Sequence, residues 1–241
     1  MSIIKIKKLF LFTFFLFFLP SSAYAGNLLL KSFGHGSFLI KGEEKSILIN
    51  PFKAIGCASH LNEPKGVNPD FILASSRLAD EGYNPNNKLM FVEPGIYKVG
   101  DILLNGVTVP HDRVGGRRFG MATVWRWEQN NLKIVHMGGA AGEMDINSQI
   151  VLARPDILFI SIGGGIKSYD GEEASKIIEA LKPNIVIPVH YATGKKIKED
   201  CDFSNSDLFL ENMDDFKVKY VGKSFEIKPK RIYKNTIYIF R

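Results

Sequence analysis

Short apolar segments, bounded by glycine, asparagine or proline, constrain the fold of this chain more than any other feature of its sequence. Examples are residues 28–33, 46–49 and 71–73. They are too short for ordinary helices and have the length and residue types of β-strands. The first half of the chain is therefore predicted to be rich in β-structure.

Two hairpins are predicted where turn-forming residues separate apolar segments. Asn105-Gly106 is a strong signal for a two-residue hairpin turn. Asn130-Asn131 marks a second turn, between two segments that are rich in apolar residues. The flanking strands are expected at residues 102–104 with 107–109, and at 122–128 with 133–136.

In the second half the pattern changes to alternating strands and helices. Asp170 and Glu173 resemble a capping box at the start of a helix. The apolar residues that follow have helical spacing, and Pro183 ends the pattern. We expect buried strands at 157–162 and 184–189, a helical stripe through Ala174, Ile177, Ile178 and Leu181, a helix from Ser204 to Asn212, and short strands in 217–241. This order predicts an α+β fold, an αββα four-layer sandwich.

The first 25 residues have the pattern of a secretory signal peptide. Lysines precede an apolar run of 11 residues, 9–19, and Ala23-Tyr24-Ala25 precedes Gly26 as a cleavage site. The alternative is an uncleaved anchor, but spanning a bilayer takes roughly 20 residues. We expect cleavage at Ala25/Gly26, membrane contact only during export, and a periplasmic or equivalent extracytoplasmic location. The mature part, 26–241, is expected to form one domain.

The charge pattern excludes a nucleic-acid-binding protein. The formal net charge of the whole chain is +6, and the three lysines of the leader account for half of it. A small excess of positive charge, without a stripe of lysine and arginine, does not indicate binding to nucleic acid. The sequence does not determine the oligomeric state.

Cys57 and Cys201 are the two cysteines of the chain. In an oxidising compartment an even number favours a disulfide. Two unrelated buried thiols are the alternative. A bridge would connect an early loop to a late one.

Histidines and acids follow several of the predicted strands. His111, His136 and His190 each end an apolar segment, and Asp80-Glu81 follow another. Strand ends that share one edge of a sheet converge, and binding sites form there. Histidine is a common metal ligand and proton carrier. These residues predict a site at one edge of the sandwich.

Six segments resemble metallo-β-lactamase-fold hydrolases, in particular the branch that includes L-ascorbate 6-phosphate lactonase. Each motif is weak alone, but their order and spacing agree from about Leu28 to Tyr191. They are the opening 34–40, the strand 47–52 with Asn50 in place of aspartate, the segment 71–82, His136 to Gly139, the glycines after Ile162, and 181–191. The resemblance implies the αββα fold.

The resemblance also implies positions for metal ligands. The first two histidines of the H-x-H-x-D-H motif fall on Ser76 and Leu78, and the bridging aspartate falls on Gly139. Leucine and glycine side chains cannot bind a metal, so a two-metal site is excluded on this alignment. The remaining ligands are Asp80, Glu81, His111 and His190, which together could hold one divalent ion, Zn, Mn or Fe.

Two functions remain open at this point. The first is a hydrolase with a reduced metal site, acting on a small anionic ester or lactone. Asp80, Glu81 and His111 would act in catalysis, while His35, Arg117 and Arg118 would bind substrate, the arginines together with backbone N–H groups of their glycine-rich loop. The second is a noncatalytic protein that binds a small ligand or a partner, with no metal. Asp80 and Glu81 would then cap a helix, and His190 would be structural.

Overall fold

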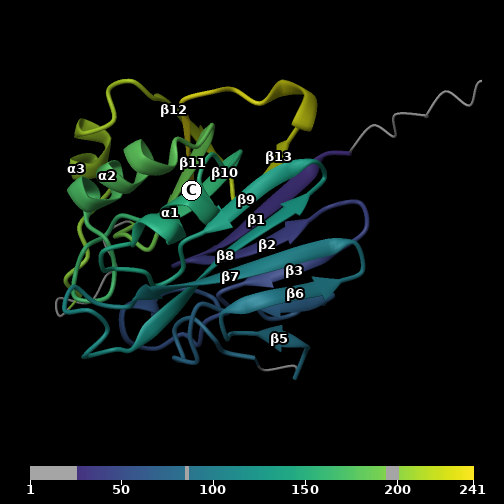
Figure 1. Cartoon of the computed structure of the whole chain (residues 1–241), viewed down its shortest axis with the longest axis horizontal. Helices are drawn as coiled ribbons and strands as arrows, with labels where there is room; N and C mark the ends of the chain where they lie inside the picture. Colours follow the sequence, from purple (N-terminus) through teal and green to yellow (C-terminus); the bar gives the residue numbers. More distant parts are fainter. Residues whose placement is uncertain (1–25, 85–86, 194–200) are drawn as a thin grey trace, which may run out of the picture.

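The computed structural model describes residues 26–84, 87–193 and 201–241. Two β-sheets pack face to face, and helices lie on the outer side of one of them (Figure 1). This arrangement confirms the predicted mixed fold of two sheets with few helices. The expected signal peptide, 1–25, lies outside the described residues. No helix in the described ranges is long and apolar enough to cross a membrane.

The six-stranded sheet comes almost entirely from the first half of the chain. Its order is β13-β1-β2-β3-β4-β5. The central pairs are antiparallel, whereas β3, β4 and β5 run parallel to one another. The strands are β1 (Leu28–Gly34), β2 (Ser37–Lys41), β3 (Ser46–Ile49), β4 (Phe71–Leu73), β5 (Met90–Phe91) and β13 (Ser224–Ile227).

The eight-stranded sheet has the order β12-β14-β11-β10-β9-β8-β7-β6. Strands β9, β10 and β11 are parallel, and β7 and β8 form an antiparallel ladder. The strands are β6 (Gly95–Val99), β7 (Ile102–Pro110), β8 (Met121–Gln129), β9 (Leu132–His136), β10 (Ile157–Ser161), β11 (Ile185–Val189), β12 (Lys217–Val221) and β14 (Thr236–Phe240).

Two apolar clusters hold these layers together. One lies between the sheets, where Phe38, Phe71, Trp125 and Phe159 are buried. The other lies between the eight-stranded sheet and the helices α1 (Ile146–Leu152), α2 (Gly171–Leu181) and α3 (Asp207–Glu211). Burial of such side chains contributes roughly 1.5–3 kcal/mol each. Two 3₁₀ turns, η1 (Gly56–Ala58) and η2 (Pro229–Arg231), complete the elements.

The hairpin predicted at Asn105-Gly106 is wrong. Both residues lie in the middle of β7, which runs unbroken from Ile102 to Pro110. A Cβ at Gly106 would lie 2.9 Å from the rings of Trp125 on the neighbouring strand. Glycine is therefore needed here for close approach across the ladder rather than for a turn. The hairpin at Asn130-Asn131 is confirmed, between β8 and β9.

The helix predictions are confirmed in one place and corrected in another. Asp170 and Glu173 form the expected capping box of α2, and Lys182 ends this helix in the left-handed conformation before Pro183. The later helix is shorter than expected. It begins after Ser206 rather than at Ser204, and ends at Glu211.

Cys57 and Cys201 form a disulfide across 144 residues of sequence, with 5.6 Å between their Cα atoms. The bond connects η1 to the segment that precedes α3. Of the two alternatives left open by the sequence, the bridge is the one that the structure contains.

Candidate functional site

The predicted site residues lie where several strands end at one edge of the sandwich. His111 follows β7, His136 ends β9 and His190 follows β11. The two sheets are in contact near this edge. The indole N–H of Trp125, in β8 of the eight-stranded sheet, donates to the carbonyl of Ala74, which follows β4 of the other sheet, at 2.8 Å. Residues 77–81 form bends and turns, so Asp80 and Glu81 do not cap a helix there.

The backbone at this edge is held in an uncommon conformation. His35, Asn50 and His190 all have positive φ angles, of 56°, 43° and 54°. Such angles are uncommon outside glycine, and they cluster at functional sites. The backbone N–H of His190 donates to the carbonyl of His35 at 2.6 Å, which fixes two of these residues against each other.

Glu81 points inward and is paired with His111. The distance between Glu81 Oε1 and His111 Nε2 is 3.0 Å, and both side chains are almost fully buried. The other carboxylate oxygen accepts hydrogen bonds from Ser75 at 2.6 Å and Ser76 at 3.0 Å. Burial would raise the pKa of Glu81, but the hydrogen bonds from His111 and Ser75 outweigh it and hold the pKa below its usual range. Glu81 is therefore an ionised carboxylate with both oxygens engaged.

Gly139 lies directly against this pair. A Cβ added there would be 2.2 Å from His111 Nε2 and 2.3 Å from Glu81 Oε1. The backbone N–H of Gly139 donates to Ser75 Oγ at 3.2 Å. The Glu81–His111 pair thus fills the space that any side chain at position 139 would enter.

Asp80, the neighbour of Glu81, points to a different partner. Its carboxylate accepts a hydrogen bond from Lys167 Nζ at 2.6 Å, and both side chains are about a quarter exposed. The same Lys167 ammonium lies 5.7 Å from the ring centroid of Phe119. A lysine cation therefore occupies the position beside Asp80.

His35 and His190 form an edge-to-face pair, with 4.1 Å between their ring centroids. Phe203 lies against His190 at 4.5 Å, and Phe52 lies 5.7 Å from His35. Burial lowers the pKa of His35 to about 4, although the charges of Asp80 and Glu81 act in the opposite direction. Burial, followed by the neighbouring His35, also lowers the pKa of His190 well below its usual value. Both imidazoles are therefore neutral at pH 7.

His136 is a structural histidine. Its Nε2 donates to the carbonyl of Gly36 at 2.9 Å, and its Nδ1 accepts from the backbone N–H of Gly138 at 3.0 Å. Burial lowers the pKa of His136 to about 4 even though the hydrogen bond to Gly36 opposes the shift. A second proton would break the bond from Gly138.

We expect His136 to make the folded protein less stable in mild acid. Its pKa lies near 4 in the folded protein and near 6.5 when unfolded, so the unfolded state binds the proton first. We expect the free energy of unfolding to fall by up to about 3 kcal/mol between pH 6.5 and 4 from this group. Urea unfolding at pH 7 and pH 5 should show a smaller difference in His136→Gln than in the wild type. The exposed His60, changed to Asn, is the control; equal pH slopes in all three proteins would contradict the prediction.

The arginine loop, residues 112–120, is organised by Asp112. Its carboxylate accepts hydrogen bonds from the backbone N–H groups of Val114, Gly116, Arg118 and Phe119, at 2.8–2.9 Å. Burial raises the pKa of Asp112, but these four bonds outweigh it and hold the pKa at about 2. Four of the loop amides that the sequence suggested for an external anion are therefore already used inside the protein.

The two predicted arginines of this loop are placed differently from each other. Arg118 has its guanidinium 5.2 Å from the ring centroid of Phe119, the ring that Lys167 also approaches. Arg117 is exposed and donates to the carbonyl of Val114 in its own loop. Arg113, which the sequence did not single out, donates to Glu173 and to the carbonyls of Gly165 and Ser168. It connects this loop to the one that carries Lys167.

The donor set does not fit a metal ion as it stands. Within the described ranges, no group of three or more His, Cys, Asp and Glu side chains could hold one. Asp80 is paired with Lys167, and Glu81 with His111. His35, Glu81, Lys167 and His111 all interact electrostatically with His190, so the predicted residues do gather in one region. They gather as one lysine–carboxylate ion pair, one hydrogen-bonded Glu81–His111 pair and one histidine pair, rather than around one point.

Lys167, Phe119 and Phe203 were missed by sequence reasoning. Lys167 follows the glycines after β10, and its position at a strand end was the only signal for it. Phe119 and Phe203 gave no signal, because a lone aromatic residue in a polar segment is as compatible with core packing as with a site.

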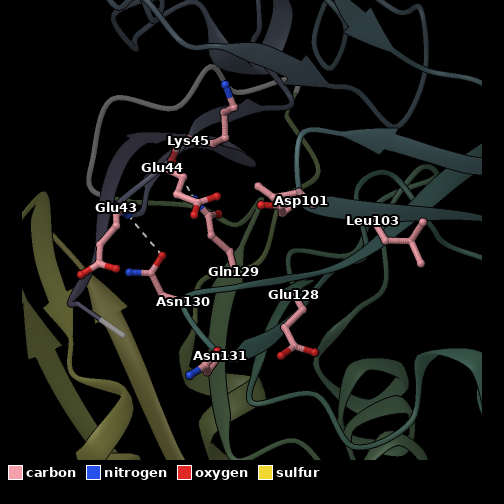
Figure 2. Close-up of a pocket in the computed structure, with 10 residues that line it drawn as sticks. Glu43, Glu44, Lys45, Asp101, Leu103, Glu128, Gln129, Asn130 and Asn131 are labelled. Carbon is pink, nitrogen blue, oxygen red and sulfur yellow. Dashed lines mark hydrogen bonds between the residues drawn. The ribbon is translucent and has the colours of Figure 1, made fainter. Parts of the chain in front are cut away.

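A separate hollow of about 460 Å³ lies at the opposite ends of the strands. It is found where β7 begins and β8 ends, and Figure 2 shows the carboxylates of Glu43, Glu44, Asp101 and Glu128 around it. None of the predicted site residues lines it, so it is not part of the candidate site.

Comparison with known proteins agrees with this fold. The chain is 29% identical over 195 residues to a protein of Thermococcus onnurineus named UPF0173 metal-dependent hydrolase, covering 69% of this chain and 86% of the relative. A relative of the same name from Thermoplasma acidophilum is 24% identical over 201 residues, covering 69% of this chain and 84% of the relative.

Solved structures give the same result. A metallo-β-lactamase superfamily protein from Thermotoga maritima superposes with a TM-score of 0.71 at 23% identity, covering 88% of this chain and 98% of the other. A metallo-β-lactamase-fold protein of Bacillus subtilis has a TM-score of 0.57 at 10% identity, covering 88% and 96%. At these identities the likeness establishes the fold.

The sequence profile of the β-lactamase superfamily domain matches residues 29–190. The match begins in β1 and ends on His190, so it includes every strand end that contributes to the site. The chain therefore belongs to the β-lactamase superfamily domain family, has the metallo-β-lactamase fold, and is related to the UPF0173 metal-dependent hydrolases.

Proposed function

We propose that this protein binds a small anionic molecule at the site around Lys167 and does not hydrolyse it with a metal ion. One observation carries the proposal: the acidic donors of the expected metal site are paired within the protein. Asp80 is bound to Lys167, and Glu81 to His111. A cation introduced at this site would have to displace both partners.

The choice of an anion follows from the charges that remain accessible. An ammonium group has three hydrogen-bond donors, and one hydrogen bond of Lys167, to Asp80, is identified. Its side chain is 25% exposed, so a ligand can reach it. Arg118 lies against the same phenylalanine ring and adds a second cation. The imidazoles of His35 and His190 are neutral at pH 7, because burial lowers the pKa of both, so they add neither positive nor negative charge to the site.

The alternative is hydrolysis of a small anionic ester or lactone at one Zn, Mn or Fe ion. The names of the relatives favour it, as does the lactonase-like opening motif. Two buried ring nitrogens, Nε2 of His35 and Nδ1 of His111, also have no hydrogen-bond partner among the described residues. For this function Asp80, Glu81, His111 and His190 would have to rearrange around the metal.

Metal analysis and anion titration together test the proposal. We expect the purified protein to hold far less than one equivalent of metal after dialysis against Zn, Mn or Fe salts, and to show no metal-stimulated ester or lactone hydrolysis. Calorimetric titration with inorganic phosphate should show binding that falls about tenfold or more in Lys167→Met, because one charge-assisted hydrogen bond contributes about 1.5–3 kcal/mol.

The matched control is Lys176→Met, since Lys176 makes an exposed ion pair with Glu172 on α2. It should bind phosphate as the wild type does. One equivalent of metal that is lost in Asp80→Ala and His190→Ala, together with metal-dependent turnover, would overturn the proposal in favour of the hydrolase.

Export is the second part of the proposal. It is supported by the leader pattern of residues 1–25, and by the Cys57–Cys201 disulfide, since disulfides persist mainly in oxidising compartments. Mass spectrometry of the protein from a secreting host should find an N-terminus at Gly26.

A further inference from the structure

A hollow of about 330 Å³ lies beside the eroded motif, between its loop and the strands β7 and β8. This volume is within the range of small-molecule sites. Ser76 and Leu78, which stand where the resemblance places two metal-binding histidines, both line it. The position of the lost ligands is therefore part of a cavity rather than a filled core.

The hollow presents apolar side chains to solvent. Leu78 is 37% exposed and Met121 is 48% exposed, and Pro94 and Phe119 also line the wall. Scattered exposed apolar residues are ordinary, but several around one concavity indicate a binding surface. An apolar group seated here would cover all four side chains.

Three of the hydroxyl groups in the lining are already satisfied inside the protein. Ser75 and Ser76 donate to Glu81, and Thr123 donates to the carbonyl of Val92 at 2.6 Å. These three have no remaining hydrogen to offer to a ligand. Apart from the hydroxyl of Thr108 and the Arg77–Glu93 pair, the lining therefore offers mainly apolar contact, and recognition of a charged group falls to the rim.

Three cations lie at or near the rim, together with the carboxylate of Glu93, which also lines the hollow. Two of the cations lie close to Phe119, a lining residue: Arg118 Cζ is 5.2 Å and Lys167 Nζ is 5.7 Å from its ring centroid. Arg77 lines the hollow itself and pairs with Glu93, with both side chains about two-thirds exposed. An exposed pair of this kind contributes little, so Arg77 can exchange Glu93 for a ligand carboxylate.

We infer that the ligand of this protein is an amphipathic anion, a carboxylate or phosphate that carries a short alkyl or aryl body. The body lies in the hollow against Leu78, Phe119 and Met121, and the anionic group lies at the rim beside Lys167, Arg118 or Arg77. The inference rests on the proposed anion-binding function and adds the chemical class of the ligand to it.

Calorimetric titration of the full mature protein with 4-phenylbutyrate and with acetate tests this inference. We expect phenylbutyrate to bind about 30-fold more tightly than acetate, because the hollow removes part of its apolar surface from water at roughly 25 cal/mol per Å². Leu78→Asn and Met121→Asn should each reduce that ratio to about fivefold or less. Both residues are partly exposed, and thermal unfolding checks that the variants fold.

The matched control is Leu103→Asn, because Leu103 is 57% exposed and lines the separate hollow at the opposite ends of the strands. It should keep the wild-type ratio. Equal affinity for phenylbutyrate and acetate, or a ratio unchanged in Leu78→Asn, overturns the inference. If phosphate still binds in a Lys167-dependent way in that case, the proposed function stands without it; if no anion binds, both fail.

Discussion

Replacing Gly139 by aspartate should destabilise the folded protein by about 3 kcal/mol, the cost of overpacking a buried site and separating a buried pair. The reason is the Glu81–His111 pair, which lies 2.2–2.3 Å from where the new Cβ must be. An aspartate at this position, which the sequence resemblance predicts for a bridging metal ligand, is therefore expected to break the Glu81–His111 pair. Urea unfolding measures the loss. Gly222→Asp is the control, because no atom lies within 4 Å of a Cβ at that glycine.

A double substitution separates this explanation from a simple loss of backbone freedom. In Glu81→Ala one of the two clashing side chains is gone, so His111 can move into the freed space and donate its hydrogen bond to an aspartate introduced in place of Gly139. The Gly139→Asp change should then cost at least about 2 kcal/mol less than in the wild type, which is a coupling in the range found for contacting residues. Additive losses in the two single variants would contradict the assigned packing.

Removing the disulfide has the second large effect. Cys57 and Cys201 close a loop of 144 residues, and the chain-entropy treatment gives up to about 5 kcal/mol for a loop of this size, with roughly 2–4 kcal/mol typical. We expect the Cys57→Ser/Cys201→Ser protein to unfold at a clearly lower urea concentration than the oxidised wild type.

Reductant provides the internal control for this experiment. The wild type should lose the same stability when it is reduced, whereas the double variant should not respond. The bond also holds the segment that carries Phe203, which lies against His190. Modification of His190 by diethylpyrocarbonate should therefore be faster without the bond. Equal urea midpoints for the oxidised and reduced wild type would show that the bridge does not stabilise the fold.

The strands were predictable because their burial depends on local apolar runs. Residues 157–162 and 184–189 are mostly apolar, and β10 and β11 are buried on both faces. Asn105-Gly106 failed for the opposite reason. The role of Gly106 depends on Trp125 from the neighbouring strand, and no local pattern reports a contact of that kind.

The convergence of the candidate residues was predictable, but their hydrogen-bond and ion-pair partners were not. Histidines and acids at strand ends gather at one edge, as expected from parallel strands. However, Asp80 and Glu81 are adjacent in sequence and bind different partners, one Lys167 and the other His111. The direction of each side chain depends on the turn at residues 77–81 and on partners that come from distant segments of the chain.

Asp112 determines how a ligand meets the rim of the hollow. Its four backbone hydrogen bonds fix the arginine loop before any molecule arrives. Binding then requires no ordering of this segment, and that conformational entropy does not subtract from affinity. On the proposed function, the protein should behave as a rigid receptor at this wall, so selectivity among anions should depend on how well their shape matches a preformed surface. Association should accordingly proceed in a single kinetic step.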